Sequence, residues 1–301
     1  MSKRDYLIRY LLIIKKLRNS KCATFKEIND YFHREFELID GPKEISLRTF
    51  QRDLTEIRTI FNIAIKCNKL NQYYIEEDDY QDYNSRLLEA FDIINSFQIS
   101  YQLKPYILLE KRCPLGTQHL NGILHAIQNR YVLDFIYRKF YTETSGVREV
   151  EPYALKEYKG RWYLVSKDFK DNLIKIFALD RISDLSISNK KFSYPAGFDP
   201  NEYFRNCFGV IVPKESEPVE IELSFEPLQG KYIKSYPLHE SQKILEDNAK
   251  ELRISLVLNE TEDLIMELLS FGSEMKVLKP KSLIDTISQT ANEMAKMYPA
   301  K

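Results

Sequence analysis

The sequence predicts an α+β protein with several domains. With 301 residues the chain is longer than one compact core usually extends, while 44% hydrophobic and 13% aromatic residues exclude a disordered chain. Helical periodicity marks the first part, aromatic-rich strands the middle, and alternating strands and helices the last part. No apolar run reaches the roughly 18 residues of a membrane span, so we expect a cytoplasmic protein without a membrane partner.

Helices are predicted for most of the N-terminal segment. In the first helix, apolar residues recur at helical spacing at Leu7, Tyr10, Leu11, Ile14 and Leu17. The second begins at Thr24, which forms a capping box with Glu27. The third begins at Ser46 as its N-cap. Its inward face is predicted to consist of Leu47, Phe50, Leu54, Ile57 and Phe61.

Two short strands, at 63–67 and 72–75, follow the third helix and are joined by a polar turn. Three helices and a β-hairpin predict a winged helix-turn-helix domain over residues 1–78, whose third helix enters the major groove of DNA. Arginine side chains pair with guanine, glutamine with adenine, and threonine reaches phosphates. The alternative is a charged face that only meets solvent. The predicted DNA-binding residues are Arg48, Thr49, Gln51, Arg52, Lys66 and Lys69.

The charge is distributed unevenly along the chain. Residues 1–75 contain 15 lysines and arginines against 9 aspartates and glutamates, a net of +6, whereas the whole chain has 44 of each. Such a basic segment indicates contact with nucleic acid, although a solvated basic face gives the same count. We therefore expect double-stranded DNA as a partner. We also expect a homodimer, because one helix-turn-helix reads too few base pairs to be selective.

The middle of the chain is predicted to be a small β-barrel over residues 117–198. Before it, residues 79–116 are predicted to form a helical connector, either a passive spacer or a lever that relays a signal. The strand at 160–168 contains the only tryptophan, and its run of aromatic and branched residues suits a surface buried on both faces. Short twisted strands with apolar faces usually curl into a barrel.

The Trp162-Tyr163-Leu164 tripeptide, with Pro152 before it and Asp180-Arg181-Ile182 after it, resembles the WYL domain. The resemblance implies an SH3-like or Sm-like barrel that acts as a sensor in bacterial transcription regulators, between a winged helix and a C-terminal extension. It also implies a surface near this strand that binds nucleic acids or nucleotides. The candidate ligand-binding residues are Tyr137, Arg148, Trp162, Tyr163, Leu164, Lys175, Phe177 and Arg181.

Alternation along one strand is predicted to place Lys175, Phe177, Leu179 and Arg181 on one face. Two cations beside an aromatic ring suit a phosphate with a stacked base, which makes an anionic ligand the expected partner of the barrel. In the alternative, Arg181 pairs with Asp180 or Asp184 and Lys175 is solvated. Trp162 shares a strand face with Leu164, and a tryptophan in that position is more often a core residue than a ligand contact.

The last part of the chain is predicted to be a ferredoxin-like unit over residues 213–301, after a linker at 199–212. The run 219–225 alternates as a half-buried strand, and the following segments give the order βαββαβ. This unit resembles the C-terminal extension of WYL proteins and is expected to support dimerisation or gating.

The sequence contains no pattern typical of an enzyme, so we expect no catalytic residues, no cofactor and no metal. It has no phosphate-binding loop and no carboxylate cluster at metal spacing, and its four cysteines lie far apart. His239 has no nucleophile motif beside it, which favours a turn role. The predicted function is a transcription factor in which an anionic ligand modulates DNA binding. The alternatives are an accessory module of a nucleic-acid-processing or defence system, and an adaptor that does not bind DNA.

Overall fold

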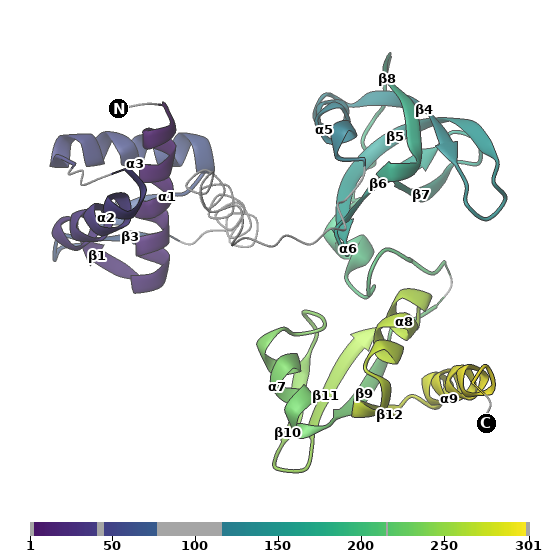
Figure 1. Cartoon of the computed structure of the whole chain (residues 1–301). Helices are drawn as coiled ribbons and strands as arrows, with labels where there is room; N and C mark the ends of the chain where they lie inside the picture. The colour runs from purple at the N-terminus through teal and green to yellow at the C-terminus, as the bar shows by residue number, and fades with distance from the viewer. Residues whose placement is uncertain (1–2, 41–44, 77–115, 215, 299–301) are drawn as a thin grey trace. The chain divides into compact units, whose positions relative to one another are not determined.

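The computed structural model describes residues 3–40, 45–76, 116–214 and 216–298 (Figure 1). The chain divides into two compact units, Met1–Glu110 and Lys111–Lys301. The predicted connector at 79–116 lies outside the described residues, apart from Gly116. In the described part, helices combine with three antiparallel sheets, which agrees with the predicted α+β class.

The N-terminal unit consists of helices and a small sheet. Its elements are α1 (Lys3–Ser20), β1 (Cys22–Thr24), α2 (Phe25–Asp40), α3 (Leu47–Phe61), β2 (Ile65–Cys67) and β3 (Gln72–Ile75). The strand order is β1-β3-β2, and Ala23 of β1 lies opposite Tyr73 of β3. The sequence did not predict β1, because three residues are too few to show apolar alternation and the strand depends on pairing with β3.

Local hydrogen bonds start α2 and α3 at the predicted residues. The Thr24 amide donates to Glu27 Oε2 at 2.7 Å, and the Glu27 amide donates to Thr24 Oγ1 at 3.3 Å. The bond from the Thr24 amide lowers the pKa of the Glu27 carboxyl. Ser46 Oγ accepts a bond from the Thr49 amide at 3.2 Å. Both capping predictions are therefore confirmed.

Helix α3 is anchored through one face. Its buried residues are Phe50, Asp53, Ile57 and Phe61, at spacings of three and four. The apolar members join a core with residues of α1 that include Ile8, Ile13, Ile14 and Leu17. The expectation that Leu47 faces inward is wrong, because its side chain is 47% exposed. Leu47 is the first residue of the helix and lies one turn beyond the buried stripe.

The buried stripe of α3 includes a carboxylate, and α1 supplies its partner. The side chains of Arg9 and Asp53 are both 0% exposed. The Nε and Nη2 groups of Arg9 donate to the two carboxylate oxygens of Asp53, with 2.6 Å for the Nη2 bond. Because both bonds must form together, the pair fixes the position of α1 against α3. Removing one partner leaves an uncompensated buried charge.

Asp53→Leu is therefore expected to lower the free energy of unfolding of the N-terminal unit by about 3–5 kcal/mol, whereas the double replacement Arg9→Met with Asp53→Leu restores most of it. Hydrogen exchange of the α1 and α3 amides measures this free energy locally. The exposed Asp30→Ala variant is the control. Equal exchange in Asp53→Leu and the control would show that the buried pair does not hold the two helices.

The second unit begins with a five-stranded sheet in the described residues. Its elements are α5 (Leu120–Asn129), β4 (Tyr131–Arg138), β5 (Ser145–Tyr158), β6 (Arg161–Asp168), β7 (Leu173–Ala178), the 3₁₀ helix η3 (Leu179–Arg181) and β8 (Ile182–Lys191). The strand order is β7-β6-β5-β4-β8. The two edge strands, β7 and β8, are thus consecutive in the chain and separated only by η3. The sheet curls around a core that includes Leu133, Val150 and Leu164, with Ile123 and Ala126 of α5 packed on it.

The predicted continuous strand from Lys175 to Arg181 is wrong. Strand β7 ends at Ala178, and Leu179 to Arg181 form η3. The chain has to pass from one edge of the curled sheet to the other within three residues, which a short 3₁₀ turn allows. Lys175 and Arg181 consequently do not share a strand face.

The last part of the second unit is a four-stranded sheet with helices. Its elements are β9 (Val219–Phe225), α7 (Pro227–Ser235), β10 (Lys243–Asp247), β11 (Leu252–Leu258), α8 (Glu262–Ser270), β12 (Met275–Lys279) and α9 (Lys281–Lys296), and α6 (Pro200–Phe204) precedes them. The strand order is β10-β11-β9-β12. Alternate residues of β9, from Ile221 to Phe225, are buried against Ile233 of α7 and Leu264 of α8. The elements follow the predicted order βαββαβ.

The segment between the two sheets is fixed to α8. Asp263 Oδ2 accepts bonds from the amides of Val210 and Ile211, at 2.9 and 3.0 Å. Lys159 Nζ, at the turn between β5 and β6, lies 2.8 Å from Glu267 Oε2 of α8. Among the described residues, no helix is long and apolar enough to cross a membrane.

Candidate nucleic-acid interface and ligand site

The outward face of α3 carries polar side chains that the fold leaves available. Arg48, Gln51 and Arg52 are exposed, on the side of α3 opposite Phe50 and Ile57. Within the described part of the chain, neither Arg48 nor Arg52 has a carboxylate at ion-pair distance. Because the helix is anchored by its other face, these side chains project from a rigid support. The arrangement can donate several hydrogen bonds to an anionic surface.

The other predicted DNA-binding residues are engaged to different degrees. Thr49 belongs to the helix cap, with its Oγ1 at 2.9 Å from Ser46 Oγ. Lys66 of β2 forms an ion pair with Glu76, and this hydrogen bond raises the pKa of the Lys66 ammonium group. Lys69, in the turn between β2 and β3, is exposed. Of the predicted set, Arg48, Gln51, Arg52 and Lys69 have side-chain donors without a hydrogen-bond or ion-pair partner in the part of the chain that the structure describes.

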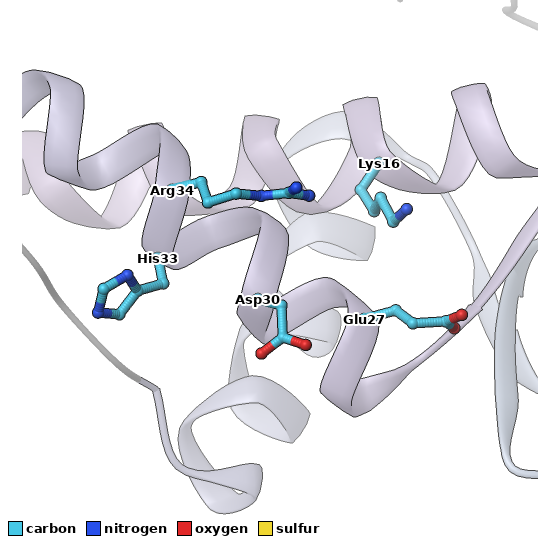
Figure 2. A pocket seen from close by; sticks show the side chains of 5 residues that line it. All are labelled: Lys16, Glu27, Asp30, His33 and Arg34. Atoms are coloured by element: carbon cyan, nitrogen blue, oxygen red, sulfur yellow. The ribbon is translucent and has the colours of Figure 1, made fainter.

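A pocket of about 430 Å³ lies between α1 and α2 (Figure 2). No pattern in the sequence predicted it. It is lined by Lys16, Glu27, Asp30, His33 and Arg34. Figure 2 shows these five side chains spread along the pocket rather than converging on one point. The Glu27 carboxylate is already used by the capping box. No group of three His, Cys, Asp or Glu side chains in the described residues is placed to hold a metal ion.

Three of the predicted ligand-binding residues of the second unit lie in its core. Tyr137, Leu164 and Phe177 are buried, with exposed fractions of 9%, 0% and 4%. The Phe177 ring contacts Tyr137 edge-on, at 4.9 Å between centroids, and the Ala178 amide donates to the Tyr137 hydroxyl at 3.3 Å. Trp162 is partly buried and packs on the same core. The first three side chains therefore belong to the core of the sheet, and their role in ligand binding stays a prediction.

Arg148 and Lys175 converge on one buried carboxylate, Asp168, which is 1% exposed. Lys175 Nζ lies 2.7 Å from Asp168 Oδ2 and 2.6 Å from Asp171 Oδ2, and Arg148 Nε lies 3.6 Å from Asp168 Oδ2. The bond from Lys175 lowers the pKa of the Asp171 carboxyl. Two cations and two carboxylates cancel in charge. Lys175 is thus neither simply solvated nor free for an anion.

Arg181 has a different environment. Its guanidinium carbon lies 4.1 Å from the centroid of the Phe140 ring, and its Nε is buried without a hydrogen-bond partner in the described structure. The expected pairing of Arg181 with Asp180 or Asp184 is wrong, because Asp180 Oδ2 instead accepts from Arg161 Nη1 at 3.2 Å. Arg181 is therefore a stacked cation with an unused donor.

Tyr163 lies near both arginines. Burial raises the pKa of the Tyr163 phenol, while the charges of Arg161 and Arg181 act to lower it. We name Phe140, Arg161, Tyr163 and Arg181 the Arg181 cluster. The carboxylates of Asp180 and Asp263 act on the same Tyr163 phenol, against the charges of the two arginines. Two residues of this cluster were not predicted from the sequence. Phe140 lies in a loop, where no pattern marks it. Arg161 could have been predicted, because it directly precedes the Trp-Tyr-Leu tripeptide.

His239 occupies a turn in the last part of the chain. Its Nδ1 accepts a bond from the Ser241 amide at 3.2 Å and lies 2.9 Å from Ser241 Oγ. Burial lowers the pKa of the His239 imidazole. These contacts agree with the turn role that the sequence favours.

Comparison with protein-family models identifies the two sheets of the second unit. The WYL domain model matches residues 118–187, which include the five-stranded sheet up to the middle of β8, and the WCX domain model matches residues 217–295. The chain belongs to the WYL domain-containing family. In this family member, the Arg181 cluster lies within the WYL domain and the sheet β10-β11-β9-β12 within the WCX domain.

Curated relatives match parts of this WYL-domain chain. It is 30% identical over 169 residues to the uncharacterized HTH-type transcriptional regulator YobV of Bacillus subtilis, a match that covers 52% of this chain and 50% of that protein. It is 40% identical over 68 residues to protein PafB of Mycobacterium tuberculosis, covering 22% of this chain and 20% of that protein. The chain thus spans half the length of the first relative and a fifth of the second.

Two solved structures are similar over nearly the whole WYL-domain chain, at low TM-scores. Proteasome accessory factor B/C (PafBC) of Arthrobacter aurescens has a TM-score of 0.36 and 20% identity, covering 97% of this chain and 47% of that one. A CRISPR Cas-related protein has a TM-score of 0.40 and 12% identity, covering 99% and 87%. Neither similarity carries an argument about fold or function.

Asp168→Asn is expected to destabilise the WYL domain by about 3 kcal/mol, because it leaves Arg148 and Lys175 without their buried counter-charge. Asp171→Asn is the matched control: its side chain is 39% exposed and contacts the same lysine, so the expected loss is below about 1 kcal/mol. Trp162, the only tryptophan, reports unfolding by fluorescence in urea. Equal losses in both variants would contradict a structural role specific to Asp168.

Proposed function

We propose that this protein is a DNA-binding transcription regulator whose N-terminal unit is a winged helix-turn-helix. The order of α1, α2, α3 and the β2–β3 hairpin supports this proposal, as does the similarity to an HTH-type regulator. The observation that carries it is the outward face of α3, where Arg48, Gln51 and Arg52 are exposed and meet no carboxylate among the described residues. In this proposal α3 enters the major groove of double-stranded DNA.

The spacing of these residues suits base recognition. Arg48 and Arg52 are four residues apart, so they lie on one side of α3 about 6 Å apart along its axis. That distance spans roughly two base-pair steps at 3.4 Å each. Gln51 lies beside them and is suited to adenine, while each arginine is suited to guanine. Lys69 reaches a phosphate from the hairpin, whereas Lys66 first has to leave Glu76.

The WYL domain is proposed to be a small SH3-like barrel that binds an anionic ligand at the Arg181 cluster. The edge strands β7 and β8 are joined by only three residues, which supports closure of the sheet. Arg181 offers an unused donor, Arg161 a second cation, and Phe140 and Tyr163 aromatic rings. This combination suits a nucleotide or a single-stranded nucleic acid, which presents phosphates and stacking bases.

Binding at the WYL domain is proposed to modulate the DNA affinity of a homodimer. The WCX domain, proposed to be ferredoxin-like, supports the assembly. A ligand changes DNA affinity only to the extent that it binds one arrangement of the dimer better than another. Typical couplings of ~1–3 kcal/mol correspond to roughly 5- to 150-fold.

Replacing Arg48 and Arg52 together by alanine is expected to weaken binding to a duplex obtained by selection from a random-sequence pool. Each lost phosphate contact also lowers the slope of log affinity against log salt by roughly one. Fluorescence anisotropy at several salt concentrations measures both quantities. Arg205→Ala, which removes an exposed arginine paired with Glu202 in the second unit, is the control. If affinity and slope match those of the control, α3 does not read DNA.

Arg181→Glu is expected to abolish binding of a labelled single-stranded oligothymidine to the WYL domain and to remove its effect on duplex binding. The reason is that a carboxylate replaces the available cation of the Arg181 cluster. Lys190→Gln serves as the control, because it removes an exposed ammonium of the same domain that is paired with Glu149. If Arg181→Glu binds oligothymidine as tightly as Lys190→Gln does, the ligand site does not lie at the Arg181 cluster.

A further inference from the structure

Tyr6, near the start of α1, contacts two arginines from different helices. The guanidinium carbon of Arg9 is 5.0 Å from the centroid of the Tyr6 ring, and that of Arg52 is 5.7 Å from it. Tyr6 itself is half-buried and packs on the N-terminal core. The ring therefore connects the buried Arg9–Asp53 pair to a residue on the exposed face of α3.

The two guanidinium groups differ in what they can still bind. Arg9 is fully buried and bonded to Asp53, the residue that follows Arg52. Arg52 is exposed, and within the described residues its guanidinium stacks on Tyr6 without a carboxylate partner. Stacking uses the face of a guanidinium and leaves the N–H donors at its edge free for a base or a phosphate.

Stacking also limits the motion of Arg52 before it meets a partner. An exposed arginine loses considerable rotamer freedom when it forms a bidentate bond, and this loss weakens binding. A side chain that is already held over a ring has less freedom to lose. The same ring also contacts Arg9, whose position is fixed by two bonds to Asp53. Arg48 has no aromatic ring at cation–π distance in the described part of the chain.

We propose that Tyr6 is a positioning residue for DNA recognition, which orders the Arg52 guanidinium for its contact with DNA. The inference rests on the proposed function, because it requires Arg52 to touch DNA. It adds that α1, through the Tyr6 ring, influences how α3 recognises DNA. The rival role for Tyr6 is core packing alone, which affects folding but not Arg52 in particular.

A double-mutant cycle on the full chain separates the two roles. Tyr6→Leu keeps an apolar side chain and removes the ring, and Tyr6→Phe keeps the ring. Affinities are measured for the selected duplex and for a mixed-sequence duplex of equal length. Tyr6→Leu is expected to weaken selected-duplex binding by roughly 2- to 5-fold, and to reduce discrimination between the duplexes, while Tyr6→Phe retains both.

The loss of DNA affinity caused by Tyr6→Leu is compared in two variants, each of which lacks one arginine of α3. In Arg52→Ala, Tyr6→Leu is expected to cause no further loss, whereas in Arg48→Ala it keeps its full effect. A second measurement needs no change at Tyr6: NMR relaxation of the free native protein should give a higher order parameter for the Arg52 Nε–H than for that of Arg48. This comparison remains valid even where Tyr6→Leu disturbs folding.

Three results overturn the inference. An equal loss from Tyr6→Leu with and without Arg52 shows that the ring acts through the fold. Equal order parameters for Arg52 and Arg48 show that Tyr6 does not restrain Arg52. If Arg52→Ala leaves affinity unchanged while Arg48→Ala lowers it, α3 still reads DNA but Arg52 has no role for Tyr6 to support. The proposed function itself is contradicted only if Arg48→Ala and Arg52→Ala both leave DNA affinity unchanged.

Discussion

The N-terminal unit depends on a charge pair that its core has to accommodate. Arg9 and Asp53 are fully buried, and their opposite charges compensate each other. Hydrophobic packing alone lets two helices slide by small amounts at little cost, whereas a bidentate bond does not. The position of α3, and with it the direction of Arg48 and Arg52, therefore follows from an interaction that makes no contact with solvent.

Charge compensation also separates structural from available cations in the WYL domain. Lys175 and Arg148 both pair with Asp168, which is 1% exposed, so moving either toward a ligand would take a counter-charge from a buried carboxylate. Arg181 carries no such obligation, because its guanidinium stacks on Phe140 and keeps a donor unused. Two arguments thus favour the Arg181 cluster as the proposed ligand site. One is its own geometry, and the other is the free energy needed to move Arg148 or Lys175 away from Asp168.

Local features of this chain could be predicted from its sequence, and distant ones could not. Thr24 and Glu27 form their capping box across three residues, so the signal lies within one turn. Arg9 and Asp53 are 44 residues apart, and a carboxylate in an apolar stripe gives no indication of its partner. The strand that was predicted to continue to Arg181 ends at Ala178, because closure of the sheet is a tertiary constraint that alternation cannot show. Predicting which cations are free requires knowing which carboxylates fold beside them.

The net charge of the chain outside the N-terminal segment opposes the anion binding that is proposed at the Arg181 cluster. Residues 76–301 carry a net charge of −6, which by itself repels a polyanion. At physiological ionic strength, exposed charges are screened over about 8 Å, so a ligand at the Arg181 cluster responds mainly to the groups around it. These groups are the two arginines, the carboxylates of Asp180 and Asp263, and the rings of Phe140 and Tyr163. In the proposed function, an anion at this cluster is consequently selected by short-range contacts rather than by long-range attraction. Such selection suits a site that has to distinguish one anionic ligand from the many others in a cell.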